Sequence, residues 1–306
     1  MATMTRAQFA KSLQDGLNAL FGLEYKDWPE EYSQYLDGET SQKAFEEDTL
    51  LTGFNYASEK TEGGEYAQDS GQEAWTKRYT NRTVGLSFTV TQEAIEDNRY
   101  IDLGKKYARA LARSLRQTAE VYGANVLNNG FTGGVYVGGD GVALFSASHP
   151  TRSAGLQSNI LSGGADLAES SVEQLLIQIR NAKDDRGIPV MIKPTKLITP
   201  TALEFDALRL LQSVNRTGTA DNDISAIKAK GFFGNMPVVV TNLTDTDAWF
   251  IKTDAMDGLK RFQRTARTVP KATVDDPTGN IVYRARERYI EGWTDWRGCF
   301  GSAGAA

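Results

Sequence analysis

The sequence predicts an α+β fold, and three patterns along its 306 residues indicate this class. Apolar residues recur at helical spacing from about Ile101 to Asn128, which predicts one long amphipathic helix. Apolar and polar residues alternate at 83–90 and again at 281–288, as in half-buried strands. Between about 161 and 261, helical patterns and short apolar runs follow one another, which favours a second compact unit with a mixed sheet and flanking helices.

The composition is that of an ordinary folded protein of about two domains at roughly 150 residues each. Hydrophobic residues make up 40% of the chain, the net charge is -5 and the mean hydropathy is -0.42, so a general affinity for nucleic acid or anionic lipid is not expected. The single cysteine, Cys299, excludes an intrachain disulfide. Because no apolar run approaches the roughly 18 residues of a membrane helix and no signal-peptide pattern is present, we expect neither membrane insertion nor secretion.

Residues 1–52 are expected to form an N-terminal arm. A short amphipathic helix around 9–20 is followed by a polar, acidic and aromatic stretch without a sustained period. The rings of Trp28 and Tyr32 have no core of their own in this segment, so they must lie on the body of the chain or on a neighbouring subunit, and they are expected to be subunit-interface residues.

Residues 53–92 predict a long two-stranded hairpin with a polar distal part. The segment is rich in Gly, Ser, Glu and Gln up to Gln72, and strand-like alternation then begins at Trp75. An isolated two-stranded ribbon is marginally stable in water, so it must fold back on its own domain or dock on an adjacent subunit, and the sequence leaves both open. If it docks, the expected contact residues are Trp75, Lys77, Arg78 and Tyr79.

The long helix carries two distinct faces. One face is apolar and is expected to pack on a core, with Tyr107, Leu111, Leu115, Ala119, Tyr122 and Val126. The other is a basic stripe of Lys105, Arg109, Arg113 and Arg116. Such a stripe can be a solvated face, can lie against phosphate, or can pair with acidic residues of another subunit. The net charge of -5 favours subunit pairing over attraction of DNA.

A hydrolase is the main enzymatic alternative, because the only histidine, His149, lies beside Ser146 and Ser148 in "DGVALFSASHP". Adjacent residues of an extended chain point to opposite sides, so Ser148 is a poor partner for this imidazole. The chain has no G-x-S-x-G elbow, no phosphate-loop motif and no second histidine for a metal, so no catalytic residue, metal or cofactor is expected. His149 is interpreted as a turn residue bonded to backbone.

The order of several motifs resembles a known family. "GLSFTVTQEAIEDN", "LFSASHP" and "DWRG" occur in the same order in the major capsid proteins of tailed bacteriophages with the Hong Kong 97-type fold, and Mu-like head proteins are the most similar group by pattern. The resemblance implies an N-terminal arm (1–52), an extended loop (53–92), a peripheral domain (93–160 and 262–306) with a spine helix at about 101–128, and an axial domain (161–261).

By this resemblance the chain is a structural virion protein that self-assembles into pentamers and hexamers of an icosahedral shell around double-stranded DNA, which it binds without sequence specificity. It further implies a portal, a scaffold and a decoration protein as partners, assembly in the host cytoplasm, and no membrane. Some members cross-link a loop lysine to the next subunit, and Lys60 and Lys77 are the lysines available here. The alternative function is an intracellular α/β enzyme of the Ser/His hydrolase kind, or a nucleic-acid-binding protein.

Overall fold

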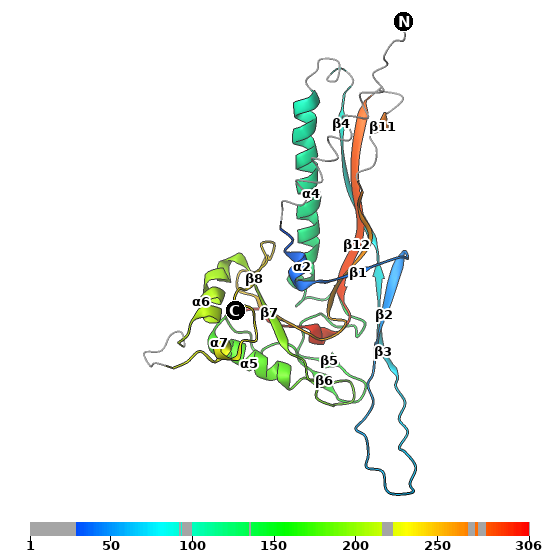
Figure 1. The fold of residues 1–306 in the computed structure, drawn as a ribbon, viewed down its shortest axis with the longest axis vertical. Helices are drawn as coiled ribbons and strands as arrows, with labels where there is room; N and C mark the ends of the chain where they lie inside the picture. The colour runs from blue at the N-terminus through cyan, green and yellow to red at the C-terminus, as the bar shows by residue number, and fades with distance from the viewer. Residues whose placement is uncertain are drawn as a thin grey trace.

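The computed structural model describes residues 29–91, 93, 100–134, 136–215, 223–268, 273–274 and 280–305. Two sheets dominate this part of the chain, and the long helix α4 (Tyr100–Asn128) lies along the larger one (Figure 1). A two-stranded ribbon projects from the body at the end opposite to the upper part of α4. The mixture of helices and sheets confirms the α+β prediction.

The larger sheet is built around the long strand β12 (Ile281–Trp293). β12 pairs antiparallel with β4 (Arg82–Val90) on one side and with β10 (Leu259–Thr268) and β11 (Thr273–Val274) on the other. β1 (Asp37–Thr40) extends the sheet beyond β10 in the parallel direction. The two segments whose alternation predicted strands, 83–90 and 281–288, thus pair with each other in this sheet.

The helix α4 covers one face of this sheet. Leu111, Ala112 and Leu115 pack on Ala285 of β12, with Val84 and Phe88 of β4 alongside. Most of the predicted apolar face is buried, but Tyr107 remains 53% exposed and only places its ring against Phe88, with 5.8 Å between centroids. In the described residues no helix is both long and apolar enough to cross a membrane.

The smaller sheet has the strand order β13 (Cys299–Ser302), β9 (Trp249–Thr253), β7 (Pro194–Thr199) and β8 (Val238–Val239). β8 is parallel to β7 and the other pairs are antiparallel, so the sheet is mixed, as predicted. Its helices are η1 (Thr201–Leu203), α5 (Glu169–Arg180), α6 (Glu204–Gln212) and α7 (Ala226–Lys230). β13 differs from the expected division at residue 262, because it leaves the first unit and pairs with β9.

The projecting ribbon pairs differently from the prediction. β3 (Glu73–Thr80) pairs antiparallel with β2 (Phe45–Leu51), whereas β4 pairs with β12. The predicted hairpin within 53–92 is therefore wrong. Only Asn81 separates β3 from β4, and one residue is too short for a reversing hairpin loop. The ribbon thus consists of β2, β3 and the connection 52–72.

The two sheets meet where β12 passes through η2 (Trp296–Gly298) into β13, beside the short pair β5 (His149–Pro150) and β6 (Leu156–Gln157). At this crossing the backbones of Gly298 and Gly258 touch. A Cβ atom on Gly298 would lie 2.3 Å from the Cα atom of Gly258, and one on Gly258 would lie 2.8 Å from the Cα atom of Gly298. Any side chain at either position therefore forces the two backbone segments apart.

We predict that Gly298→Ala lowers the free energy of unfolding by about 2 kcal/mol, because the added methyl group must displace backbone rather than a flexible side chain. Urea unfolding followed by circular dichroism measures the change. Gly234→Ala is the matched control, since its Cβ atom would meet nothing within 4 Å. Equal stability of the two variants would show that the close approach does not stabilise the crossing.

Candidate interaction surfaces

The arm is held on the body by the short helix α2 (Tyr32–Tyr35). The backbone N–H groups of Glu31 and Tyr32 donate to the carboxylate of Glu120 on α4, at 3.2 and 2.9 Å. Tyr32 is only 9% exposed, and its ring lies 4.1 Å from the guanidinium of Arg261. Tyr32 therefore packs against the body of its own chain, and the prediction that it lies at a subunit interface is wrong. Trp28 lies outside the described residues.

Arg116 does not belong to an exposed basic stripe. It is 2% exposed, with Nη1 2.5 Å from Glu30 Oε1 and Nε 3.6 Å from Glu120 Oε1. The arm folds over this part of α4, which residue spacing along the helix cannot reveal. Burial raises the pKa of Glu120, although Tyr32 and Arg116 oppose the shift. Arg109 and Arg113 are exposed, and the side chain of Lys105 lies outside the described part of the chain.

Tyr79 anchors the ribbon to its own chain. Its side chain is 2% exposed, its ring centroid lies 5.0 Å from that of Phe262, and its hydroxyl lies 2.6 Å from Thr294 Oγ1. Burial raises the pKa of this phenol far above its ordinary value. The prediction that Tyr79 lies against a neighbouring subunit is wrong for this side chain, because the larger sheet already covers it.

The other predicted ribbon residues also contact their own chain. Trp75 is half-buried under the guanidinium of Arg152, at 5.1 Å. Lys77 donates to the carbonyl oxygen of Val137, and burial lowers its pKa although Asp140 opposes the shift. Arg78 is exposed and lies over Phe45 at 3.6 Å. These four positions therefore form the root of the ribbon, and Arg78 and part of Trp75 remain accessible.

Lys260 ties the arm, the ribbon and the body together. Its ammonium lies 3.0 Å from Glu39 Oε1 of β1, 2.7 Å from Asp48 Oδ2 of β2 and 2.5 Å from Asp257 Oδ1. The side chain of Lys260 is only 7% exposed. Burial alone would lower the pKa of Lys260, but the three carboxylates more than compensate and raise it. The charge is thus retained, and it fixes the ribbon to the sheet edge.

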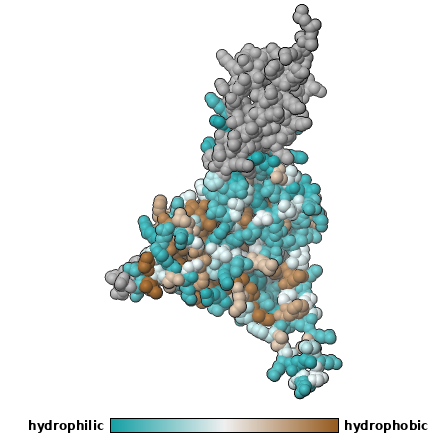
Figure 2. All heavy atoms as spheres, in the orientation of Figure 1, coloured by the Kyte–Doolittle hydropathy of each residue, from teal (hydrophilic) through white to brown (hydrophobic). Residues whose placement is uncertain are grey.

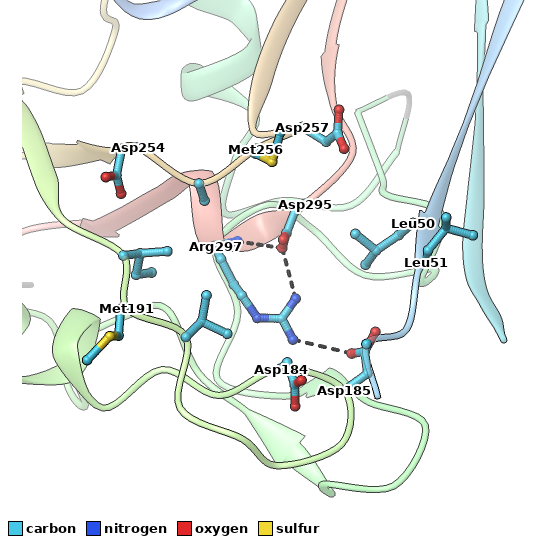
Figure 3. A pocket seen from close by; sticks show the side chains of 14 residues that line it. Leu50, Leu51, Asp184, Asp185, Met191, Asp254, Met256, Asp257, Asp295 and Arg297 are labelled. Carbon is cyan, nitrogen blue, oxygen red and sulfur yellow. Dashed lines mark hydrogen bonds and ion pairs between the residues drawn. The ribbon is translucent and has the colours of Figure 1, made fainter. Parts of the chain in front are cut away.

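A pocket of about 340 Å³ lies between the ribbon root and the smaller sheet (Figure 3). Arg297 lines this pocket (Figure 3). Its guanidinium lies 3.3 Å from Asp185 Oδ1 and 3.1 Å from Asp295 Oδ1 and donates to the carbonyl oxygen of Lys183 at 2.8 Å. Burial raises the pKa of Asp295, and Arg297 opposes the shift. Within the described residues no group of His, Cys, Asp or Glu side chains is arranged to hold a metal ion. The carboxylates of Asp185 and Asp295 neutralise the buried guanidinium group of Arg297.

His149 is fully buried and its two ring nitrogens are both engaged. Nδ1 lies 2.7 Å from Asp140 Oδ2, and Nε2 lies 3.1 Å from the carbonyl oxygen of Leu144. The ring stacks on Trp296 with 4.8 Å between centroids and an angle of 8°. The exposed hydroxyls of Ser146 and Ser148 lie 3.3 Å from each other. The predicted bond of His149 to backbone is confirmed, but the residue lies in the strand pair of β5 and β6 and not in a turn. This arrangement leaves neither nitrogen to activate a serine.

Sequence reasoning missed the buried charges that organise these surfaces: Glu120, Lys260, Arg261 and Arg297. Arg297 stands in the "DWRG" motif, which signalled the family but not the ion pairs. Lys260 and Arg261 lie in the run "GLKRFQRTART", which carries no alternation that marks them as buried. Their burial depends on acidic partners distant in sequence.

A long helix on a sheet built around the C-terminal strand, a second mixed sheet and a projecting ribbon define the class of Hong Kong 97-type capsid subunits. Residues 73–301 match the family model of the phage capsid proteins, and the chain belongs to this family. A comparison with curated protein sequences found no relative.

Solved structures of low sequence identity share the fold. A virus-like particle from Pyrococcus furiosus superposes with a TM-score of 0.53 at 11% identity, covering 94% of this chain and 98% of that chain. The structure from Mycobacterium phage Che8 gives 0.51 at 14% identity, over 88% and 89%. The capsid of an empty GTA particle gives 0.51 at 11% identity, over 91% of each chain. The chain is thus a major capsid protein, a self-associating structural component of the virion shell, and the hydrolase and nucleic-acid-binding alternatives are not favoured.

We predict that Lys260→Met lowers the free energy of unfolding by about 2 kcal/mol, because three carboxylates then face each other without a cation. We also expect faster proteolysis within 52–72, since the ribbon root loosens. Lys252→Met is the control, as Lys252 pairs with a single exposed carboxylate, that of Asp37, at 2.7 Å. Identical unfolding and cleavage rates for the two variants would contradict the anchoring role of Lys260.

We predict that His149→Ala costs about 3 kcal/mol of stability, because it removes a fully buried ring that stacks on Trp296 and leaves Oδ2 of the buried Asp140 carboxylate without its His149 partner. Thermal and urea unfolding measure the loss, and Ser148→Ala, at an exposed position, serves as the control. Neither variant should differ from the parent toward generic ester and peptide substrates. Hydrolysis by the parent that disappears in His149→Ala alone would revive the enzymatic alternative.

Proposed function

We propose that this capsid protein assembles into pentamers and hexamers of an icosahedral shell that encloses double-stranded DNA, and that the ribbon is its main contact with the neighbouring subunit. The observation that carries this proposal is the exposure of large apolar side chains on the projecting ribbon. Leu51, Phe54, Tyr56 and Tyr66 are 69%, 63%, 73% and 79% exposed. Side chains of this kind gain roughly 1.5–3 kcal/mol each on burial.

The distal ribbon receives little support from its own chain. Residues 53–72 are exposed apart from Gly64, and a side-chain contact to the body is the bond from Arg186 Nη2 to the carbonyl oxygen of Ser70, at 2.8 Å. A two-stranded ribbon of this length is marginally stable alone. In a shell made of identical chains, the surface available to cover it at every position is another copy of this chain.

The remaining roles follow from the family resemblance. We assign the larger sheet with α4 to the peripheral domain and the smaller sheet, including 299–302, to the axial domain at the capsomer centre. Lys105, Arg109 and Arg113 are proposed as contacts to acidic groups of an adjacent subunit, with packaged DNA bound without sequence specificity. Portal, scaffold and decoration proteins are the proposed further partners, and the host cytoplasm is the proposed site of assembly.

We predict that deletion of Ser58–Gln72 leaves the body folded but abolishes closed shells, because the printed bonds of the deleted part go mainly to Thr52 and Asn55 of the ribbon itself and reach the body at Arg186. Circular dichroism and the thermal midpoint report folding, and electron microscopy with size-exclusion chromatography reports assembly. A Gly/Ser segment of equal length in place of 58–72 is the control for chain length. Normal shells from the deletion variant would refute the proposed role of the ribbon.

A further inference from the structure

The pocket of about 340 Å³ between the ribbon root and the smaller sheet is strongly acidic (Figure 3). Five carboxylates and one guanidinium group line it: Asp184, Asp185, Asp254, Asp257, Asp295 and Arg297. We propose that this pocket binds a linear aliphatic polyamine, whose ammonium groups meet the carboxylates while its methylene groups lie on the apolar wall. The inference does not depend on assembly, because every residue that carries it belongs to one chain.

Two buried carboxylates of the pocket share a single cation. Asp185 is 4% exposed and Asp295 is 8% exposed, and each pairs with Arg297 through Oδ1. Oδ2 of each has no hydrogen-bond partner among the described residues, and in Figure 3 the second oxygen of Asp185 is turned away from Arg297. Burial raises the pKa of Asp295 and the neighbouring Asp185 raises it further, although Arg297 opposes the shift. One guanidinium group therefore does not fully compensate both carboxylates, and the pocket favours a further cation.

Two further carboxylates of the pocket are held in place by the backbone. Oδ1 of Asp184 accepts from two N–H groups of the turn that follows it, at 2.8 Å each, and Oδ1 of Asp254 accepts from the N–H group of Lys193 at 2.6 Å. Oδ2 of each likewise has no hydrogen-bond partner in the part of the chain that the structure describes. A Cβ atom on Gly53 would lie 3.2 Å from Asp184 Oδ2, so the lack of a side chain there keeps this oxygen accessible. The carboxylates are thus oriented before a ligand arrives, which lowers the entropic cost of binding.

Exposed apolar side chains complete the pocket. Met191, Met256 and Leu51 are 95%, 85% and 69% exposed, and all three line it. Methionine is a flexible apolar side chain that adapts its shape to a bound partner. A ligand with a chain of methylene groups removes these side chains from water, which a small inorganic cation cannot do. The pocket therefore favours a ligand that is both cationic and aliphatic.

A polyamine fits this arrangement better than a metal ion does. Among the described residues no group of three or more His, Cys, Asp or Glu side chains could hold a metal ion, so the pocket carboxylates do not converge on one point. A polyamine carries its charges at intervals along a flexible chain, and it can therefore meet carboxylates that stand apart. The volume of the pocket also lies within the range of ordinary small-molecule sites, about 300–1,000 Å³.

Calorimetric titration of the purified, unassembled chain with spermidine tests the site. We expect one spermidine per chain, and roughly tenfold weaker binding by the Asp184→Asn/Asp254→Asn variant, which loses two charges but keeps both Oδ1 acceptors. Asp245→Asn is the matched control, because this exposed aspartate also accepts a backbone N–H group through Oδ1, at 3.0 Å, but does not line the pocket. Thermal midpoints without ligand report folding. Equal affinities of the two variants would overturn the proposal, since general attraction to an acidic chain would then explain the binding.

The methionines provide a second readout that needs no variant. Hydrogen peroxide converts accessible thioethers to sulfoxides, and mass spectrometry follows each position. Spermidine should slow the oxidation of Met191 and Met256 but not that of Met236, which is 66% exposed and does not line the pocket. Butylamine and magnesium chloride at the same concentration should protect neither. Equal protection by butylamine would replace the polyamine with a single ammonium group, such as a lysine side chain, and protection by magnesium would replace it with a metal ion. Unchanged oxidation of Met191 and Met256 in spermidine would refute the pocket as the binding site.

Discussion

The crossing of the chain between its two sheets is the constraint on which the rest of the structure depends. Arg297 is buried there and neutralised by Asp185 and Asp295, and the Trp296 ring beside it stacks on His149. A buried cation is tolerated only when its partners are close and its remaining donors are used, and Lys183 accepts one of them. Because these groups come from three distant parts of the sequence, the crossing forms only when both sheets are in place.

The ribbon and the arm attach to this frame through charges as well as through apolar packing, since Tyr32, Tyr35 and Leu36 of the arm belong to the main hydrophobic core. Lys260 joins β1, β2 and β10 with one ammonium group, and Glu120 holds the start of α2 on the long helix. The hydrogen bonds in these charged contacts fix the direction of the attached segments, because a hydrogen bond weakens steeply when its angle departs from linear. Aromatic packing of Tyr79 on Phe262 completes the root. The orientation of the ribbon is thus set by its root, while its distal part stays available.

Local periodicity explains which predictions succeeded. The long helix and β12 could be predicted from the sequence because each buries one regular face, so the spacing of apolar residues alone identifies them. The pairing partners of strands could not be predicted in this way. The segment "FEEDTLL" of β2 carries acidic residues where apolar–polar alternation would indicate a strand, so its pairing with β3 was not predicted. Arg113 and Arg116 look alike in spacing, yet only Arg116 meets Glu30 of the arm. Contacts between segments distant in sequence decide these cases, and no periodicity encodes them.

The separation between a buried frame and an exposed ribbon has a consequence for assembly. The frame pairs buried charges such as Lys260 and Arg297 with carboxylates of the same chain, so the subunit can fold before it meets another. The ribbon does the opposite, because its rings and carboxylates find few partners until a neighbour supplies them. Ordering that segment on contact costs conformational entropy, which lowers the affinity of each single contact. Many such contacts, each weak alone, still hold a closed shell firmly, because every further contact forms within an existing assembly at high effective concentration. Weak single contacts also let a misplaced subunit leave before the shell closes.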